Sequence, residues 1–385
     1  MVDSTADEID ALPGDGLCAS ASGACTLRAA LAEANARPAR YLITLPAGKY
    51  DVRLGELVVG DLTTVSGVNP DETVISPKGR GRAFSVVDGA TATITDLMIR
   101  NGGSVDAGGA IANYGTLTLD GVTLKDNVLI DGIGGAVYNS GTLNVLRSTV
   151  ERSKAFAGGG IFNDGGTVTV TDTTIARNHT RDGGGGGIYN SGTLTVSNSI
   201  FWKNRARLGF GGGGIYNPGT ADLVNVTFSF NRARLTFGGA INNDGAMVLT
   251  NVTLSDNQAA HGSGGLVNNG VDSLHNTVIT RSFTHHTYDN CYGNDVLSLG
   301  HNVENGTTCH LGGPNDMSNT DAMLLLLKND GGPTKTRPLS PHSPLVDAGD
   351  NDGCPSMDQR HEPRPVDGNG DHNAVCDIGA YELQP

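Results

Sequence analysis

Positive charge gathers in the middle of a chain that is acidic as a whole. From Arg147 to Arg234 there are ten Lys and Arg residues against five Asp and Glu, whereas the full chain of 385 residues has a net charge of −14. Much of this excess lies at two fixed positions after an asparagine that recurs along the chain and is replaced once by serine. The first following residue is Lys154, His179, Arg205 or Arg232, and the third is Phe156, Arg181, Arg207 or Arg234.

Equal offsets in stacked repeats would place these side chains in two rows along the stack. Guanidinium groups at the ~4.8 Å spacing of neighbouring strands repel one another unless an anion or a carboxylate compensates. We therefore predict that the rows bind an extended acidic polysaccharide or cell-surface glycan, with Phe210 and Phe237 offering flat faces to its sugar rings. The alternative is a solvated loop edge that nearby Asp and Glu neutralise.

Two kinds of polysaccharide cleavage are compatible with these residues. A lyase needs a base to remove a proton and a cation to stabilise the enolate, and His179 with Arg205 or Arg181 is the candidate set. A hydrolase needs two carboxylates, and Asp106 and Asp131, in loops of adjacent repeats, would lie ~5 Å apart, as in retaining enzymes. Both aspartates stand close before glycines and are equally explained as turn residues.

Two further clusters lie near the C-terminal end. The segment DGNGDHN (367–373) places Asp367, Asn369 and Asp371 at alternate positions, as in a calcium loop, although no bidentate Glu follows at the expected distance. Ca²⁺ is therefore the one cofactor that we consider. The segment HHTYDNCYGND (285–295), with His301 and His310, is either a site or the packing of disulfide-linked loops.

Six cysteines fall into three local pairs, and none lies in the repeats. The pairs are Cys18 with Cys25, Cys291 with Cys309, and Cys354 with Cys376. An even number confined to irregular ends is typical of disulfides and of an oxidising compartment. The zinc alternative lacks a CxxC motif. The opening MVDSTADE is no signal peptide, and we interpret Met1 as an initiator added to a processed secreted form.

The elements that would position these residues are repeats of 24 to 27 residues. One asparagine per repeat falls at Asn113, Asn139, Asn163, Asn190, Asn217, Asn243 and Asn268, and a second register falls at Asn101, Asn127, Ser153, Asn178, Asn204, Asn231 and Asn257. Between them, runs such as GTLTV (192–196) alternate in polarity, which predicts strands. Without crossover helices, successive repeats must pair strand on strand, so we predict a solenoid of about ten coils, a parallel β-helix. The stacked asparagines would hydrogen-bond to one another as a ladder.

The two ends should close the stack. Residues 25–38 predict an amphipathic helix with Thr26 as its N-cap, Pro38 beyond its end, and Leu27, Ala30, Leu31 and Ala34 on one face. The run AMLLLLKN (322–329) predicts a second helix. We therefore divide the chain into an N-terminal cap (1–60), coils (61–285) and an irregular C-terminal cap (286–385).

Three segments carry a resemblance to known families. CTLRAALAEANA (25–36) with ITLPAGKY (43–50) resembles the CSLREA-type leader of secreted bacterial β-helix proteins. The segment 343–382 is similar to the choice-of-anchor Q type, with His361 where that family usually shows glycine. GGAI (108–111, 238–241) and FWKN (201–204) resemble repeats of polymorphic outer-membrane proteins. This resemblance implies a right-handed, pectin-lyase-like β-helix, secreted or on a bacterial surface, but not one activity.

Composition narrows the function without fixing it. The acidic whole argues against a nucleic-acid partner, and no run of 18 apolar residues is present to span a membrane. Two functions are expected: a secreted protein that binds, and in one version cleaves, an anionic polysaccharide; or a non-catalytic adhesin or structural β-helix. The oligomeric state is left open.

Overall fold

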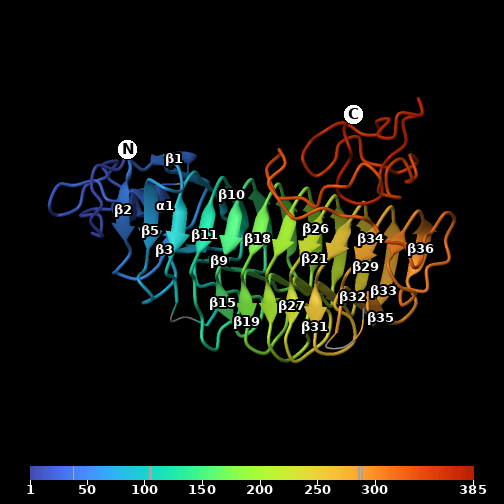
Figure 1. Ribbon diagram of the computed structural model, residues 1–385. Helices are drawn as coiled ribbons and strands as arrows, with labels where there is room; N and C mark the ends of the chain where they lie inside the picture. The colour runs from blue at the N-terminus through green and yellow to red at the C-terminus, as the bar shows by residue number, and fades with distance from the viewer. Residues whose placement is uncertain (38, 104–105, 285–286, 288) are drawn as a thin grey trace. The chain divides into compact units, whose positions relative to one another are not determined.

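The protein folds as a right-handed parallel β-helix, the all-β class predicted from its repeats. The computed structural model describes residues 1–385 except 38, 104–105, 285–286 and 288. Two compact units are present, Met1–Thr169 and Val170–Pro385. Each contains successive coils of short strands (Figure 1). Pro38, His285, His286 and Tyr288, which entered the predictions above, lie outside the described residues.

A full coil contains four strands, which we call first to fourth in chain order. In the N-terminal unit the first strands are β1 (Tyr41–Thr44), β4 (Thr63–Ser66), β7 (Thr91–Thr95), β10 (Thr116–Asp120) and β13 (Thr142–Leu146). The second strands are β2 (Gly48–Asp51), β5 (Thr73–Ser76), β8 (Met98–Arg100), β11 (Thr123–Lys125) and β14 (Thr149–Glu151). The third is β15 (Lys154–Ala155), and the fourth strands are β3 (Leu57–Val59), β6 (Phe84–Val86), β9 (Ile111–Asn113), β12 (Val137–Asn139) and β16 (Ile161–Asn163).

The C-terminal unit repeats this order after β17 (Thr167–Thr171). Its first strands are β21 (Thr193–Ser197), β25 (Thr220–Val224), β29 (Ala246–Thr250), β33 (Val271–His275) and β36 (Leu297–Gly300). The second strands are β18 (Thr174–Ala176), β22 (Ile200–Trp202), β26 (Thr227–Ser229), β30 (Thr253–Ser255), β34 (Val278–Thr280) and β37 (Val303–Glu304). The third strands are β19 (His179–Thr180), β23 (Arg205–Ala206), β27 (Arg232–Ala233) and β31 (Gln258–Ala259), and the fourth are β20 (Ile188–Asn190), β24 (Ile215–Asn217), β28 (Ile241–Asn243), β32 (Leu266–Asn268) and β35 (Cys291–Gly293).

Alternation along each strand separates a narrow core from the surface. In β21, Leu194 and Val196 are buried while Thr193 and Thr195 are exposed. Parallel pairing then sets residues of one type on successive coils: Phe201 pairs with Phe228, and their rings stack with centroids 4.6 Å apart. Because side chains repeat with period two, this register fixes which residues face outward on every coil.

The predicted asparagine ladder is confirmed within each unit. Asn113 donates its Nδ2 hydrogen to Oδ1 of Asn139 at 2.6 Å, and Asn217 donates in the same way to Asn243 at 2.6 Å. In the second register, Asn204 donates to Oδ1 of Asn231 at 3.0 Å. All of these amides are buried. The hydrogen bonds satisfy side chains that would be costly to bury alone, so the ladder is part of the scaffold.

The ladder differs from the prediction at both ends. Asn101 is one residue out of register, because Gly102 lies opposite Asn127 and donates its backbone N–H to Oδ1 of Asn127 at 2.8 Å. Asn243 does not donate to Asn268; its Nδ2 hydrogen-bonds Oδ1 of Asp272, in β33, at 2.8 Å. Asn268 instead donates to the carbonyl oxygens of Asn294 and Asp295. The buried side chain of Asp272 stands where Met247 stands one coil earlier, which brings its carboxyl within reach of Asn243.

The predicted N-terminal helix is present as α1 (Leu27–Ala36), and Thr26 caps it by accepting a hydrogen bond from the Ala29 backbone at 3.1 Å. Its buried face contains Leu27, Ala29, Leu31, Glu33 and Ala34, so Ala29 takes the place expected for Ala30. Glu33 is buried because its carboxylate accepts hydrogen bonds from the backbone of Gly14 and Gly16.

The predicted helix at 322–329 is wrong. This segment is irregular and forms antiparallel bridges, Leu324 with Leu339 and Lys328 with Thr336. Ala322 and Leu324 are buried, whereas Met323 and Leu325, the residues that alternate with them, are 40% and 44% exposed. A core that takes alternate side chains, with backbone partners across from them, favours an extended segment over a helix. All three predicted cysteine pairs form disulfides.

The tail after residue 330 lies along one corner of the C-terminal coils. That corner, between first and second strands, repeats a left-handed residue: Asp172, Asn198, Asn225, Asn251 and Asn276 all have positive φ. The tail forms hydrogen bonds with each of these five residues. Asn225 donates to the Met357 carbonyl at 2.8 Å and Asn276 to the Asp350 carbonyl at 2.9 Å. His361, with a φ of 71° in the region that favours glycine, contacts Asp172 at 2.8 Å.

Candidate functional site

The third strands of the C-terminal unit place the predicted basic residues side by side. His179 is the register partner of Arg205, Arg205 is the partner of Arg232, and Arg232 is the partner of Gln258. Between the basic positions, Ala206 and Ala233 are fully buried. A small residue that packs inward therefore forces each neighbouring arginine to the outside.

The second predicted row is formed in the same way. The backbone N–H of Arg207 donates to the Thr180 carbonyl at 3.1 Å, and that of Arg234 donates to the Ala206 carbonyl at 2.8 Å. Arg207, Arg232 and Arg234 are exposed, and Arg205 is partly buried. We call Arg205, Arg207, Arg232 and Arg234 the arginine surface. Arg181 is exposed one coil earlier, before Arg207.

The arginine surface lacks internal neutralisation. Among the described residues, no carboxylate lies within 4.0 Å of any of its four guanidinium groups, whereas Arg147 pairs with Asp120. Burial lowers the pKa of Arg205, and the charges of Arg234, Arg232 and Arg207 lower it further. Its Nε is buried without a partner in the described part of the chain. The alternative of arginines neutralised by nearby Asp and Glu does not fit these four.

Aromatic rings lie in the loops that follow these strands. Phe210 is 56% exposed and stacks on Tyr216 with ring centroids 5.1 Å apart and planes 4° from parallel. The hydroxyl of Tyr216 donates to Asp244 at 2.6 Å, which fixes that ring. Phe237 is 41% exposed and lies beside His261. Flat, exposed rings therefore accompany the arginines of the same coils.

Four other predicted residues belong to the N-terminal unit. Lys154, on β15, and Phe156 belong to the N-terminal unit, where Lys154 is exposed and pairs by backbone with Val128. Asp106 and Asp131 are exposed in loops of that unit. Because Ala107 bridges to Ile133, Asp106 lies opposite Gly132 and is offset by one residue from Asp131. Their catalytic role stays a prediction.

The predicted calcium loop is held by its own backbone. Asp367 accepts hydrogen bonds from the N–H groups of Gly370, Asp371 and His372 at 2.7 to 3.1 Å, and Asn369 donates to Asp371 at 3.4 Å. No group of three or more His, Cys, Asp or Glu among the described residues could hold a metal ion. Calcium binding stays a prediction, and these contacts do not support it.

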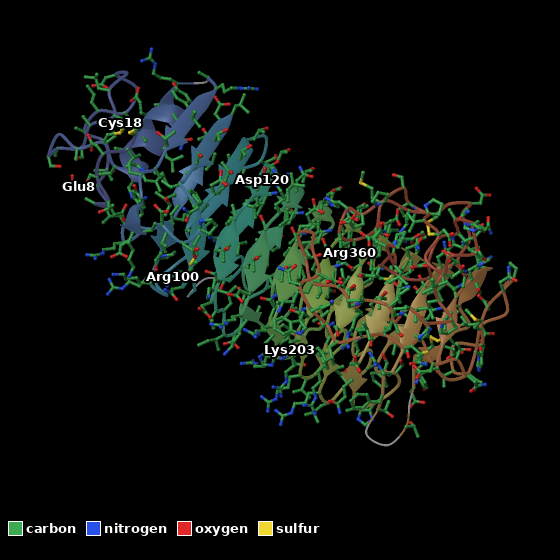
Figure 2. The ribbon with its side chains drawn as sticks, turned by 45° about the horizontal axis from the view of Figure 1, so that its top comes forward. Glu8, Cys18, Arg100, Asp120, Lys203 and Arg360 are labelled. Atoms are coloured by element: carbon green, nitrogen blue, oxygen red, sulfur yellow. A yellow bond between two sulfur atoms is a disulfide. The ribbon has the colours of Figure 1, made fainter. Side chains whose placement is uncertain are left out.

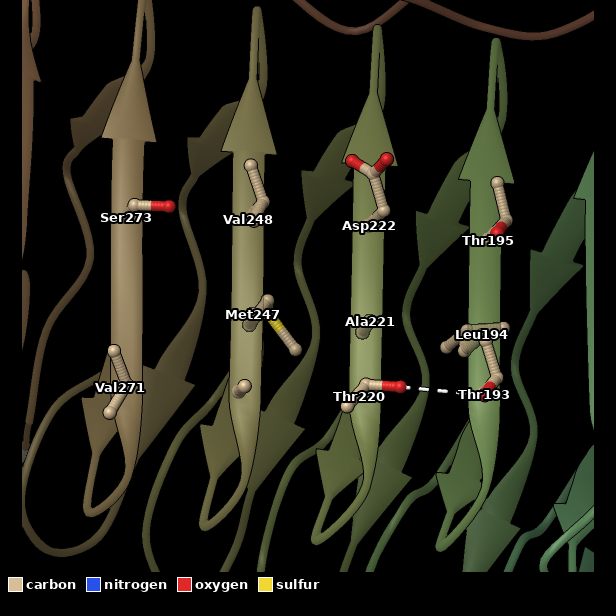
Figure 3. A pocket seen from close by; sticks show the side chains of 11 residues that line it. Thr193, Leu194, Thr195, Thr220, Ala221, Asp222, Met247, Val248, Val271 and Ser273 are labelled. Carbon is tan, nitrogen blue, oxygen red and sulfur yellow. Dashed lines mark hydrogen bonds between the residues drawn. The ribbon is translucent and has the colours of Figure 1, made fainter.

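A shallow pocket lies on the outer face of the first strands (Figure 3). It is lined by Thr193, Leu194, Thr195, Thr220, Ala221, Asp222, Ala246, Met247, Val248, Val271 and Ser273. Asp222 is the one charged residue in this lining. The first strands form this pocket, whereas the arginine surface lies on and after the third strands. With one carboxylate and no cation, the pocket is unsuited to an acidic sugar.

A group of residues around Trp202 was missed in the sequence. Arg177 and Lys203 stand immediately before Asn178 and Asn204, and both have positive φ. Lys335 approaches from the tail. Figure 2 labels Lys203 at an edge of the coils where nitrogen-tipped side chains project outward. Because Arg177 and Lys203 each stand one residue before an asparagine of the second register, the repeats could have revealed both. Lys335 lies outside the repeats.

Comparisons with known proteins agree with this fold. Residues 71–233 match the family of right-handed beta helix regions. Pectate lyase Pel9A is similar in structure, with 15% identity, 98% of this chain and 97% of that chain covered, and a TM-score of 0.51. The A-module of the mannuronan C-5 epimerase AlgE4 from Azotobacter vinelandii has 13% identity, coverage of 72% and 90%, and a TM-score of 0.23, too low to support an argument.

A search of curated proteins gives no match. The fold, the family match and the arginine surface together define a right-handed, pectin-lyase-like β-helix with a basic edge. The resemblances to CSLREA-type and choice-of-anchor Q segments stay predictions. At 15% identity the likeness to Pel9A shows the fold alone, because one fold hosts many activities.

Proposed function

We propose that this chain is an extracellular β-helix protein whose arginine surface binds an extended anionic polysaccharide. The observation that carries the proposal is that Arg205, Arg207, Arg232 and Arg234 stand on neighbouring coils without a carboxylate partner in the described part of the chain. Holding like charges at strand spacing costs free energy, and a bound polyanion would remove that cost.

The spacing favours a polymer over a small anion. Register partners on adjacent parallel strands repeat every ~4.8 Å, so the two rows extend along the stack as a series of equivalent positions. Charged groups repeated along a polysaccharide can follow such a series. Phe210 and Phe237 add exposed ring faces, which suit the apolar faces of sugar rings.

Two other features support an extracellular setting and a glycan partner. Three disulfides are typical of proteins that fold in oxidising compartments. The pectate lyase that shares the fold acts, by its name, on an acidic polysaccharide. The proposal nevertheless rests on the arginines, since fold alone does not determine function.

Replacing the four arginines by serine tests the proposal. We expect binding to polygalacturonate to weaken at least tenfold, which corresponds to about 1.4 kcal/mol. Binding is measured by retention on the immobilised polymer at several salt concentrations, because screening weakens contacts of this kind. The matched control changes four exposed arginines of the N-terminal unit to serine: Arg40, Arg53, Arg80 and Arg147. Equal retention of both variants would refute the proposal.

Cleavage is tested separately. Hydrolysis by a carboxylate pair is not supported at the arginine surface, because the described residues supply no carboxylate within 4.0 Å of its guanidinium groups. Lyase chemistry would use His179 as base and Arg205, its register partner, to stabilise the enolate. Incubation with a panel of acidic glycans should then give an unsaturated product that His179→Ala abolishes while binding persists. Binding without product would favour the non-catalytic adhesin.

A further inference from the structure

Three cations converge on the one tryptophan of the chain. The guanidinium carbon of Arg177 lies 4.6 Å from the Trp202 ring centroid, and the ammonium nitrogens of Lys203 and Lys335 each lie 4.7 Å from it. No two of the charged ends can therefore be more than twice 4.7 Å apart. We call these four residues the Trp202 cluster.

The cluster contains hydrogen-bond donors and no acceptor. Among the described residues, none of the three cations has a carboxylate within 4.0 Å, and the buried indole Nε1 has no hydrogen-bond partner. Attraction to the indole face offsets only part of the repulsion between three positive charges, because each cation–π contact is weak where side chains are exposed. The side chains of Arg177, Lys203 and Lys335 are all on exposed residues.

A nearby corner of the coils shows how the same protein neutralises buried charge. Arg337, from the same tail as Lys335, is buried and lies over Phe230, the residue that follows Ser229, the register partner of Trp202. There Asp256 accepts hydrogen bonds from Arg337 and from Arg281. The Trp202 cluster has the aromatic ring and the tail cation but lacks the carboxylate, so its missing component is an anion.

We propose that the Trp202 cluster is an anion site that takes a sulfate or phosphate group, either as the free ion or as an ester on a glycan. Three cations that approach one ring from three segments suit a tetrahedral group with several terminal oxygens better than a carboxylate, which offers two. Because Lys335 belongs to the tail, the bound anion would also link the tail to the coils. The residues of this site are different from those of the arginine surface, so this proposal does not depend on that surface.

The single tryptophan makes the test direct, since all indole fluorescence comes from Trp202. The full chain is titrated with sodium sulfate or sodium phosphate while sodium chloride keeps the ionic strength constant. We expect a saturable change in emission. Lys335→Gln, Lys203→Gln and Arg177→Gln should each weaken the apparent affinity at least tenfold. Lys328→Gln, at an exposed lysine that pairs with Asp330 just before the tail, should leave it unchanged.

Further arms identify the source of the group and keep the two proposals distinguishable. Dextran sulfate should give a tighter fluorescence response than free sulfate if the site takes an ester on a polymer, and polygalacturonate should give a weaker one. The variant that lacks the four surface arginines should keep its response to free sulfate. No saturable change in the wild type, or equal affinity in all three cation variants and the Lys328→Gln control, would overturn the anion site.

Discussion

The buried carboxyl group of Asp272 has few of the partners that usually hold an acid in its charged form. Burial raises the pKa of Asp272 well above its ordinary value, and the Asn243 amide, its hydrogen-bond donor, only partly opposes this shift. Its second oxygen is buried without a partner in the described part of the chain. The Asp272 side chain therefore favours its neutral, protonated form. It accepts the hydrogen bond from Asn243 in place of the next asparagine, and the stability of the fold becomes sensitive to pH.

This shift predicts how stability depends on pH. The folded state holds the Asp272 proton after the unfolded chain has lost it, so its contribution is complete below about pH 4 and falls as pH rises through the higher folded pKa. Asp272→Asn should remove this component of the slope and keep the bond from Asn243. Urea denaturation from pH 4 to 8 measures it, with the exposed Asp222→Asn as control. An unchanged slope in Asp272→Asn would contradict the expectation.

At the scale of elements, the ladder shows why the coils need so few apolar residues. The Asn217 amide donates to Asn243 and also to the backbone carbonyls of Gly219 and Ala246 at 3.2 Å. One side chain thus ties its own turn to the next coil. These bonds lie in a buried strip, where competing water is absent and a missing donor leaves acceptors unpaired.

Removing one rung should therefore be costly. We expect Asn217→Ala to lower the free energy of unfolding by about 3 kcal/mol, because it leaves buried carbonyl oxygens without a donor and opens a small cavity. Asn294→Ala, on an exposed asparagine beyond the ladder, should change it by less than about 1 kcal/mol. Chemical denaturation followed by circular dichroism compares them. Similar losses in both variants would argue against a ladder that stabilises the coils.

Periodicity explains what the sequence could and could not predict. Strands, ladder and basic rows follow from equal offsets, because stacked coils convert a position in the repeat into a position in space. The cap helix followed from its N-cap threonine and apolar face. Outside the period the same reasoning fails: four consecutive leucines at 324–327 suggested a helix, yet backbone pairing with residues 336–339 makes the segment extended. Lys335 reaches Trp202 only through that irregular tail.

For the whole molecule, the tail adds a group of charges that the coils lack. Arg364 lies within 3.3 Å of Glu382, and Arg360 within 2.7 Å of Asp358, all of them buried. Asp377 accepts hydrogen bonds from the backbone of Asp347 and Leu383. Burial raises the pKa of Asp377 to about 7, and the nearby charge of Glu382 adds to the rise.

The tail should accordingly be held more firmly at pH 6 than at pH 8. A carboxyl whose pKa is raised by folding contributes stability at low pH, and this contribution is lost as pH rises to about 7. Limited proteolysis of the native protein at both pH values, with mass spectrometry of the fragments, measures tail release. Asp377→Asn should weaken the tail at both values and abolish the difference between them. A difference that persists would assign the effect to another group.

The bonds between tail and coils also impose an order of events on a growing chain. Each coil pairs with one made about 26 residues earlier, so strands can stack as they are synthesised. His361, however, contacts Asp172 across 189 residues of sequence. The corner formed by Asp and Asn residues with left-handed backbone stays open to water until nearly all of the described chain has been made. Closure of that corner is thus a late step of folding, and an interrupted chain would expose to water a row of Asp and Asn side chains that the finished chain covers.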